Sequence, residues 1–144
     1  MAPYQKKRKH PKKEGDFVKE FMIEFVDGLI VRPWYFKTHG EPMQIRGVPD
    51  ILCCFGGLFV GIEFKVMRQG KIKVSPMQEY VMECIRKAKG LCFVVWFDEN
   101  NAEVGIGLQR FDNTKVAANY LSDSINRLYA LYEDKCEEIT KGPA

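Results

Sequence analysis

The sequence contains no long apolar segment, and this absence argues against a membrane protein. No run approaches the roughly 18 apolar residues that a membrane-spanning helix requires. The basic, polar N-terminus is not followed by an apolar stretch, so no secretory signal is expected. We therefore expect an unexported protein of the cytoplasm, or of the nucleus in a eukaryotic host.

Cysteine is too sparse and too irregularly spaced to predict a zinc site or a disulfide framework. The 144 residues include five cysteines, an odd number, and no two of them form a Cys-x-x-Cys pair. Most lie inside apolar segments, which favours buried free thiols in a reducing compartment. They are Cys53, Cys54, Cys84, Cys92 and Cys136.

Positive charge is concentrated at the N-terminus. The sequence carries 22 basic and 19 acidic residues, and residues 1–13 hold six of the basic ones and no acid. The remaining 16 basic residues are outnumbered by the 19 acidic ones, so the body is mildly acidic. Such an arm can contact phosphates, with affinity gained from counterion release. It can also be a solvated tail or a nuclear-import signal. We expect residues 1–13 to be a disordered arm and residues 14–144 to be one domain.

Hydrophobic periodicity predicts a mixture of helices and strands. Apolar residues recur at helical spacing from Glu14 onward. A second helical pattern starts at Pro76, is capped by Ser75 and ends at Gly90. The almost continuous apolar run 91–97 is typical of a buried, parallel strand. The expected helices are 14–29, 76–89 and 114–138, the expected strands are 30–37, 50–55, 58–66, 91–97 and 103–111, and 38–48 is an expected loop.

The pair Gly56-Gly57 separates two apolar strands and predicts a tight hairpin, because both turn positions tolerate a positive φ. With that turn, paired positions sum to 113, so Asp50 faces Glu63 across the hairpin. Opposed residues have Cβ atoms about 4.5–5.5 Å apart. Lys65 lies two residues beyond Glu63 and therefore emerges on the same face. Two carboxylates and one ammonium thus converge on one patch of the sheet.

This patch has the chemistry of a metal site. Two facing carboxylates in an apolar setting repel each other unless a positive charge lies between them. Mg²⁺ meets that need, since it commonly uses one or two carboxylates and completes its shell with water and phosphate. Lys65 is then placed to orient or deprotonate a water, or to stabilise charge that builds on a phosphorane. The simpler interpretation is an ion pair of Lys65 with Glu63 or Asp50 on a solvent-facing strand.

Four short motifs occur in order around this hairpin: Phe36-Lys37-Thr38-His39-Gly40, Arg46-Gly47-Val48-Pro49-Asp50, Gly61-Ile62-Glu63-Phe64-Lys65 and Ser75-Pro76-Met77-Gln78. Together they resemble the VRR-NUC branch of the PD-(D/E)xK nuclease superfamily, over about residues 14–97. The resemblance implies an α/β fold with a restriction-endonuclease-like αβββαβ core, which agrees with the expected order of elements. An additional strand and helix would follow at the C-terminus.

The resemblance also implies roles for the residues of the hairpin. Asp50 and Glu63 would bind Mg²⁺, with Mn²⁺ as the expected substitute. The main-chain carbonyl of Phe64 would add a further ligand. Lys65 would be the catalytic lysine.

Two more positions follow from the same resemblance. Gln78 matches a glutamine that supports the site in such enzymes, although a glutamine there is also an ordinary surface amide. The family has an acid on its first helix, and Glu14 matches best in phase, with Glu20 as the alternative. An acid at a helix start is also a common partner of the helix dipole.

Basic residues flank the predicted site in loops and are candidates for phosphate contacts. Lys37 and His39 stand just before the site, where they would touch the scissile or a flanking phosphate, although a lone loop histidine is more often a surface residue. Several others would together form a rim that follows the phosphates, each alone being an ordinary surface charge. These are Arg46, Arg68, Lys71 and Lys73.

The predicted function is a metal-dependent DNA endonuclease. It would be selective for DNA structure, because no helix-turn-helix or zinc-finger pattern supplies base reading. At this chain length the resemblance implies a nuclease that resolves four-way junctions in DNA repair or recombination and is often a homodimer, whose two active sites cut two strands. Two alternatives are a catalytically silent nucleic-acid-binding protein on the same fold and a nuclease subunit that a partner targets.

The C-terminal helix is one candidate interface for such a homodimer. Its apolar stripe is rich in leucine and includes Tyr120, Tyr129 and Tyr132. Packing of this stripe against the protein's own core is the slightly favoured alternative.

Overall fold

The computed structural model describes residues 14–38 and 46–140, and the side chains within these ranges as far as residue 131. The basic arm, His39 and the side chains of Tyr132 and Cys136 lie outside this description. The helices are α1 (Glu14–Gly28), α2 (Pro76–Lys87) and α3 (Thr114–Thr140). The strands are β1 (Trp34–Lys37), β2 (Ile51–Phe55), β3 (Leu58–Met67), β4 (Leu91–Asp98), β5 (Val104–Ile106) and β6 (Gln109–Phe111).

The six strands form one mixed sheet in the order β1-β2-β3-β4-β5-β6. The β3–β4 pair is parallel and the other neighbouring pairs are antiparallel. Helix α2 connects β3 to β4, as a crossover between parallel strands requires. The α/β class is therefore confirmed, as is the predicted order of helix, three strands, helix and strand.

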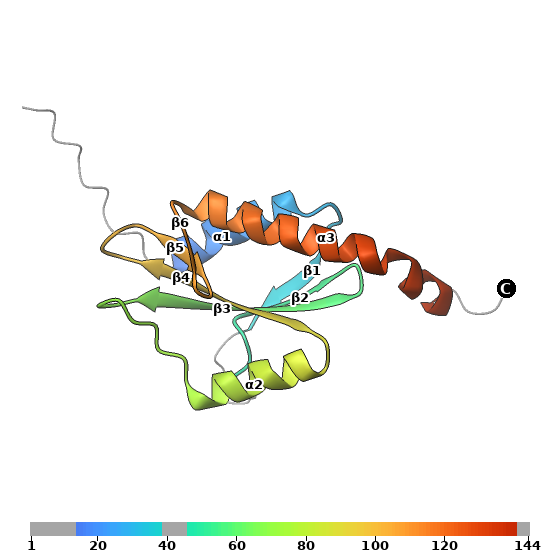
Figure 1. The fold of residues 1–144 in the computed structure, drawn as a ribbon, viewed down its shortest axis with the longest axis horizontal. Coiled ribbons are helices and arrows are strands. Elements are labelled where there is room, and N and C mark those ends of the chain that lie inside the picture. The colour runs from blue at the N-terminus through green and yellow to red at the C-terminus, as the bar shows by residue number, and fades with distance from the viewer. Residues whose placement is uncertain (1–13, 39–45, 141–144) are drawn as a thin grey trace, which may run out of the picture.

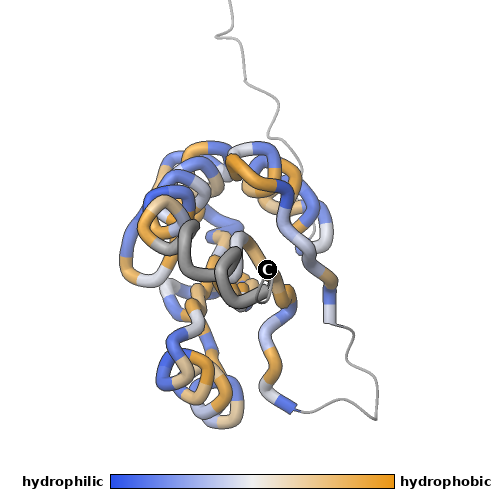
Figure 2. The backbone as a smooth tube through the Cα atoms, turned by 90° about the vertical axis from the view of Figure 1, so that its right-hand side faces the viewer, coloured by the Kyte–Doolittle hydropathy of each residue, from blue (hydrophilic) through white to orange (hydrophobic). Residues whose placement is uncertain are grey.

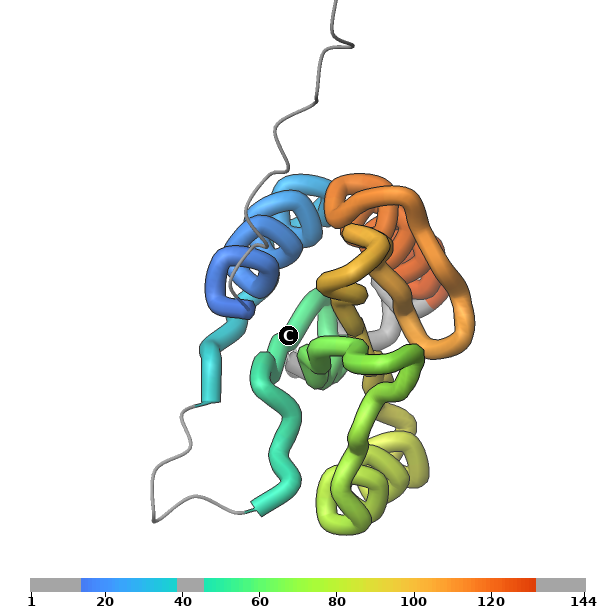
Figure 3. The backbone as a smooth tube through the Cα atoms, turned by 90° about the vertical axis from the view of Figure 1, so that its left-hand side faces the viewer, coloured from blue at the N-terminus to red at the C-terminus, as the bar shows by residue number. Residues whose placement is uncertain are grey.

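The helices cover the two faces of the sheet unequally. Helices α1 and α3 lie side by side on one face, and α2 lies alone on the other (Figure 1, Figure 3). Apolar and polar residues alternate along the helices (Figure 2). Helices α1 and α3 bury their apolar residues in the core, whereas α2 buries only Met82. The aromatic core forms under α1, where the Phe17 ring stacks on Phe97 at a centroid distance of 5.2 Å. Phe21 and Phe64 meet edge to face in the same layer at 5.5 Å.

The β2–β3 hairpin has the predicted turn and register. Gly56 and Gly57 have φ values of 53° and 83°, which side chains other than glycine rarely adopt. Ile51 pairs with Ile62, so paired positions sum to 113 as expected. This register places Asp50, directly before β2, beside Glu63 in β3.

Helix α3 packs on the protein's own core through its apolar stripe. Ala117, Leu121 and Ile125 are fully buried, and Tyr129 packs against Phe55 at a centroid distance of 5.2 Å. The interpretation that this stripe serves the core is thus confirmed for these residues. Among the described helices, none is long and apolar enough to cross a membrane.

The strand predicted over 30–37 was too long. It begins at Trp34, because Pro33 has no N–H to donate to a ladder and Asn126 of α3 holds the preceding turn. The Asn126 side chain accepts from the Ile30 N–H at 3.0 Å and donates to the Gly28 carbonyl at 2.9 Å.

The strand predicted over 103–111 was also wrong, because two strands occupy this segment. Ile106 pairs with Gln109, so Gly107 and Leu108 form a two-residue turn. Gly107 has a φ of 59°, a conformation that glycine adopts without steric cost. The additional C-terminal unit is therefore a β-hairpin and a helix.

The cysteines whose side chains are described are all free. Cys53 and Cys92 are buried, as predicted. Cys54 and Cys84 are exposed, so the prediction of buried thiols was wrong for these two. The reason is that Cys54 points away from the core in the alternation of β2, and α2 buries only Met82.

Candidate active site

Asp50 is held at the start of β2 by its backbone. The Thr38 N–H donates to the Asp50 carbonyl at 2.8 Å, and the Thr38 hydroxyl donates to the Pro49 carbonyl at 2.8 Å. One carboxylate oxygen of Asp50 accepts the Phe64 N–H of β3 at 2.8 Å. Asp50 is thus fixed from both neighbouring strands, with its carboxylate at the edge of the hairpin.

Glu63 is the buried member of the pair. Its side chain is 5% exposed, and its Oε1 accepts a hydrogen bond from Gln78 Nε2 at 3.0 Å. The Lys65 ammonium lies 3.5 Å from the same oxygen. Lys65 is 20% exposed and emerges on the same face as Glu63, as the alternation of β3 predicts.

Gln78 connects Glu63 and Lys65 to the start of α2. Its Oε1 accepts from Lys65 Nζ at 2.9 Å and from the Ser75 N–H at 3.0 Å. The Ser75 hydroxyl in turn accepts the Gln78 N–H at 3.2 Å, which completes a capping box. One glutamine therefore caps the helix and fixes the position of two charged side chains, which an ordinary surface amide would not do.

Burial and neighbouring charge both act on Glu63. Desolvation, and then the nearby Asp50 carboxylate, raise the pKa of Glu63 from 4.5 to about 7. The Lys65 ammonium lowers this pKa but does not cancel the rise. Near neutral pH the site is therefore short of positive charge between its two carboxylates.

The donor set fits a small, hard cation. Asp50 and Glu63 supply carboxylate oxygens. Phe64, whose carbonyl is the predicted further ligand, lines the cavity that opens beside these two residues. Among the described residues, no three acidic, histidine or cysteine side chains gather closely enough to hold an ion by themselves. Two carboxylates with water and phosphate suit Mg²⁺, which keeps several waters when bound to proteins.

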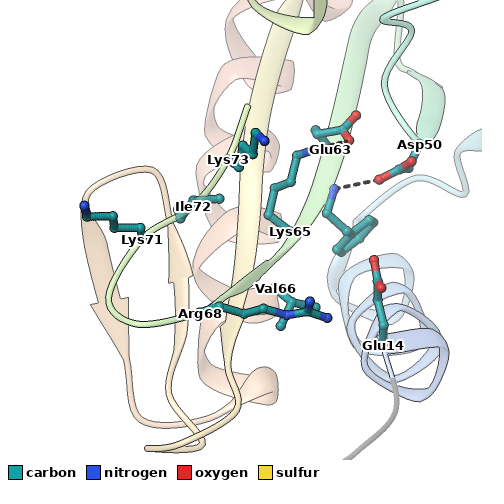
Figure 4. Close-up of a pocket in the computed structure, with 10 residues that line it drawn as sticks. Glu14, Asp50, Glu63, Lys65, Val66, Arg68, Lys71, Ile72 and Lys73 are labelled. Atoms are coloured by element: carbon teal, nitrogen blue, oxygen red, sulfur yellow. Dashed lines mark hydrogen bonds and ion pairs between the residues drawn. The ribbon is translucent and has the colours of Figure 1, made fainter. Parts of the chain in front are cut away.

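A cavity of about 640 Å³ opens beside the two carboxylates. We call it the catalytic cavity, for the catalysis that its lining residues are predicted to perform. Figure 4 shows acidic groups on one side and the cationic 68–73 loop on the other. Its lining residues are Glu14, Asp50, Glu63, Phe64, Lys65, Val66, Arg68, Lys71, Ile72 and Lys73.

The 68–73 loop is a tight structure that places its cations at the cavity. The Arg68 N–H donates to the Lys71 carbonyl and the Lys71 N–H to the Arg68 carbonyl, both at 3.0 Å. Gln69 and Gly70 form the turn between them, with positive φ values of 52° and 72°. Arg68 and Lys71 are thus anchored opposite each other, and Lys73 follows toward α2.

The structure distinguishes between the two candidate acids of the first helix. Glu14, the first residue of α1, lines the catalytic cavity and points toward Asp50 (Figure 4). Glu20, almost two turns later, is not among the lining residues. Glu14 lines the cavity with Asp50 and Glu63 without forming a three-carboxylate group with them.

The remaining predicted phosphate contacts are less close to the cavity. Lys37 is exposed at the end of β1, where it pairs with Ile51, the residue after Asp50. Arg46 is exposed and does not line the catalytic cavity. His39 lies outside the described residues.

Thr38 is a positioning residue that the sequence did not single out. It belongs to the first of the four motifs, and its backbone and hydroxyl fix the segment that carries Asp50. The motif could have indicated this role, because a threonine hydroxyl next to a strand end commonly bonds the backbone.

Comparison of the sequence with protein-family models and with curated proteins gave no match. The family resemblance therefore remains a prediction, and the function must be inferred from the site.

Proposed function

We propose that this protein is a Mg²⁺-dependent deoxyribonuclease that hydrolyses phosphodiester bonds in the catalytic cavity. The observation that carries the proposal is the hydrogen-bonded cluster of Asp50, Glu63, Lys65 and Gln78 beside a cationic loop. The two carboxylates are suited to bind a metal cation, and the surrounding lysines and arginine are suited to bind an anion. A phosphodiester bridged to a metal satisfies both demands.

Each residue of the proposed site has a separate role in the reaction. Bound Mg²⁺ would supply Lewis acidity to a phosphate oxygen and activate a water. Asp50 and Glu63 would hold the ion, and Asp50 is oriented for this by the Phe64 N–H. Lys65 would stabilise negative charge on the phosphorane or orient the attacking water, with its position set by Gln78.

The cationic loop would hold the DNA backbone on either side of the scissile bond. Arg68, Lys71 and Lys73 line the same cavity as the carboxylates. The Arg68 side chain extends toward the acidic side of the cavity, whereas the Lys71 ammonium points away from it (Figure 4). Contacts of this kind position the backbone without reading sequence. This supports selectivity for DNA structure, including branched DNA, over selectivity for sequence.

Two other functions use the same surface. A catalytically silent DNA-binding protein would need the cationic loop but not the buried carboxylate of Glu63, whose raised pKa makes it costly to keep without a cation. A nuclease subunit targeted by a partner would cleave only when the partner is present. The buried carboxylate of Glu63 therefore favours a nuclease over a silent DNA-binding protein.

We place the predicted homodimer interface at β1, since Ala117, Leu121 and Ile125 of the described part of α3 are buried in the core. In the described sheet β1 is an edge strand, and its residues Trp34, Tyr35 and Phe36 are 67%, 43% and 42% exposed. An exposed aromatic edge strand readily pairs with another strand, here β1 of a second copy. Sedimentation velocity should show a dimer that Tyr35→Pro dissociates, and a monomer at high concentration would contradict this placement.

Cleavage of a DNA panel tests the proposed function directly. The panel comprises a four-way junction, a flap, a single strand and a plain duplex, each with Mg²⁺, Mn²⁺ or EDTA. We expect cleavage that requires the metal and differs among the structures. Binding without cleavage under every metal condition would support the silent alternative.

A further inference from the structure

A second, smaller hollow adjoins the catalytic cavity. It measures about 340 Å³ and is lined by Met67, Gly70, Ile72, Trp96, Gly107, Leu108 and Arg110. Ile72 lines both spaces, so the two share a wall. Figure 4 shows the β5–β6 hairpin, in pale orange, beside the loop that carries Lys71 and Ile72. We call this space the hairpin hollow.

The floor of the hairpin hollow is formed by the Arg110 guanidinium stacked on the Trp96 ring. The Arg110 guanidinium lies over the Trp96 ring at 5.1 Å from its centroid. Trp96 is buried, and its indole N–H donates to the Gly107 carbonyl at 2.9 Å, which ties the ring to the hairpin turn. Glu103 accepts from the edge of the guanidinium at 2.8 Å. Arg110 is therefore held flat before any ligand arrives.

The rim of the hairpin hollow is apolar and unusually exposed. Leu108 sits at the turn of the hairpin with its side chain fully in solvent, at 103% of the reference exposure. A leucine in this position gains nothing from the protein's own core. Beside it, Arg110 remains 53% exposed, so its plane is accessible although one edge is paired.

We propose that the hairpin hollow binds an unpaired nucleobase of the DNA strand whose phosphate lies in the catalytic cavity. The inference rests on the proposed nuclease function and specifies its substrate as DNA with unstacked nucleotides beside the cut. A base is a flat, largely apolar ring, which stacks on guanidinium planes and packs against exposed apolar side chains. The cationic loop between the two spaces holds the phosphates that connect the base to the scissile bond.

The chemistry of the hollow favours an unpaired base over a paired one. A paired base cannot enter, because its faces are covered by neighbouring bases and its edge by its partner. An apolar side chain such as Leu108 can also wedge between bases at a branch point, as apolar side chains do in bent DNA. The hollow would thus select branched, bulged or single-stranded DNA over continuous duplex.

Binding to a matched pair of DNA probes tests the inference. One probe is a duplex with a short unpaired bulge, and the other is identical but carries abasic residues in the bulge. Affinities are measured by fluorescence anisotropy with Ca²⁺ in place of Mg²⁺, and a gel verifies that the DNA stays intact. The full-length protein should bind the probe with bases about tenfold more tightly, the scale of one stacked base.

Variants of the hairpin locate the effect. Arg110→Ala and Leu108→Ala should each reduce the preference for bases several-fold, because each removes one surface on which a base stacks or packs. Arg110→Lys should reduce it too while keeping the dependence on salt, since it retains the charge but lacks the plane. Gln109→Ala is the matched control, because Gln109 is exposed between the two residues and does not line the hollow.

The outcomes separate this inference from the proposed function. Equal affinity for the two probes, or a preference that survives both alanine variants, would overturn the hollow as a base site. Metal-dependent cleavage in Mg²⁺ would then still support the nuclease. A base preference that depends on Arg110, without cleavage of any probe, would support the hollow and overturn the nuclease.

Discussion

Glu63 is buried beside another carboxylate, and this makes stability depend on pH when no metal is bound. Its pKa is raised to about 7 in the folded protein, while the unfolded chain titrates near 4.5. The folded state therefore binds more protons between these values, and the free energy of unfolding falls as pH rises through that window. We expect a loss of up to roughly 3 kcal/mol by pH 8, and Mg²⁺ should restore stability there.

Chemical denaturation from pH 4.5 to pH 8, with EDTA or Mg²⁺, measures this effect. In Glu63→Gln the pH-dependent loss and the gain from Mg²⁺ should both be smaller. Glu83→Gln is the control, because Glu83 is exposed on α2 and should behave as the unaltered protein. A Glu63→Gln profile that matches the unaltered protein would show that Glu63 does not carry the effect.

Lys65 is expected to serve chemistry and not metal binding. Lys65→Ala removes the ammonium 3.5 Å from Glu63, so Mg²⁺ should bind as tightly or more tightly. The chemical step should slow by about 100-fold or more, the effect of losing one charge-stabilising group. Single-turnover cleavage and a Mg²⁺ titration measure the two effects separately. Weakened metal binding with unchanged single-turnover cleavage would make Lys65 structural.

The N-terminus of α2 couples helix stability to the site. Ser75→Ala removes the hydroxyl that accepts the Gln78 N–H and so loosens the first turn of α2, which carries Gln78. We expect a cost of about 1 kcal/mol and a fall in melting temperature of about 3 to 5 °C. Asn113→Ala is a matched control, because Asn113 accepts the Val116 N–H at 2.9 Å at the start of α3. Both variants should lose similar stability, but only Ser75→Ala should lower the cleavage rate. Equal cleavage rates in the two variants would uncouple the cap from the site.

The local elements were predictable where short-range chemistry determines them. Gly56-Gly57 fixes the turn of the hairpin, and the turn fixes which residues face each other. The start of α2 is also defined locally, because Ser75 caps the helix and Pro76 occupies its first position. The start of β1 was not predictable, because Asn126 in a distant helix holds the turn before it.

The sequence predicted which strand residues form the site, but it did not predict how their side chains contact Gln78. Alternation along β3 placed Glu63 and Lys65 on one face, but it gave no distance from either residue to Gln78. That bridge depends on how the crossover helix docks, which is a tertiary effect. The hairpin hollow was not predicted either, since it requires β5 and β6 to be separate strands.

At the scale of the whole molecule, the basic arm should add DNA affinity without adding chemistry. Deleting residues 1–13 removes six positive charges from a body that is otherwise net negative. Affinity should weaken for all DNA sequences alike, and the slope of log affinity against log salt should shrink by up to about 0.9 for each phosphate that the arm neutralises. Filter-binding titrations at several salt concentrations measure this change in slope. Identical slopes would mean that the arm does not contact phosphates.

Mg²⁺-dependent cleavage by carboxylate variants tests the central claim most directly. Asp50→Asn and Glu63→Gln keep the shape of each side chain and remove a metal-binding charge, and circular dichroism verifies their folding. At limiting Mg²⁺ we predict that the unaltered protein cleaves branched DNA, while each variant is slower by about 100-fold or more, as expected when a metal ligand is removed. Full cleavage by either folded variant at limiting Mg²⁺ would contradict the assignment of Asp50 and Glu63 as the metal site.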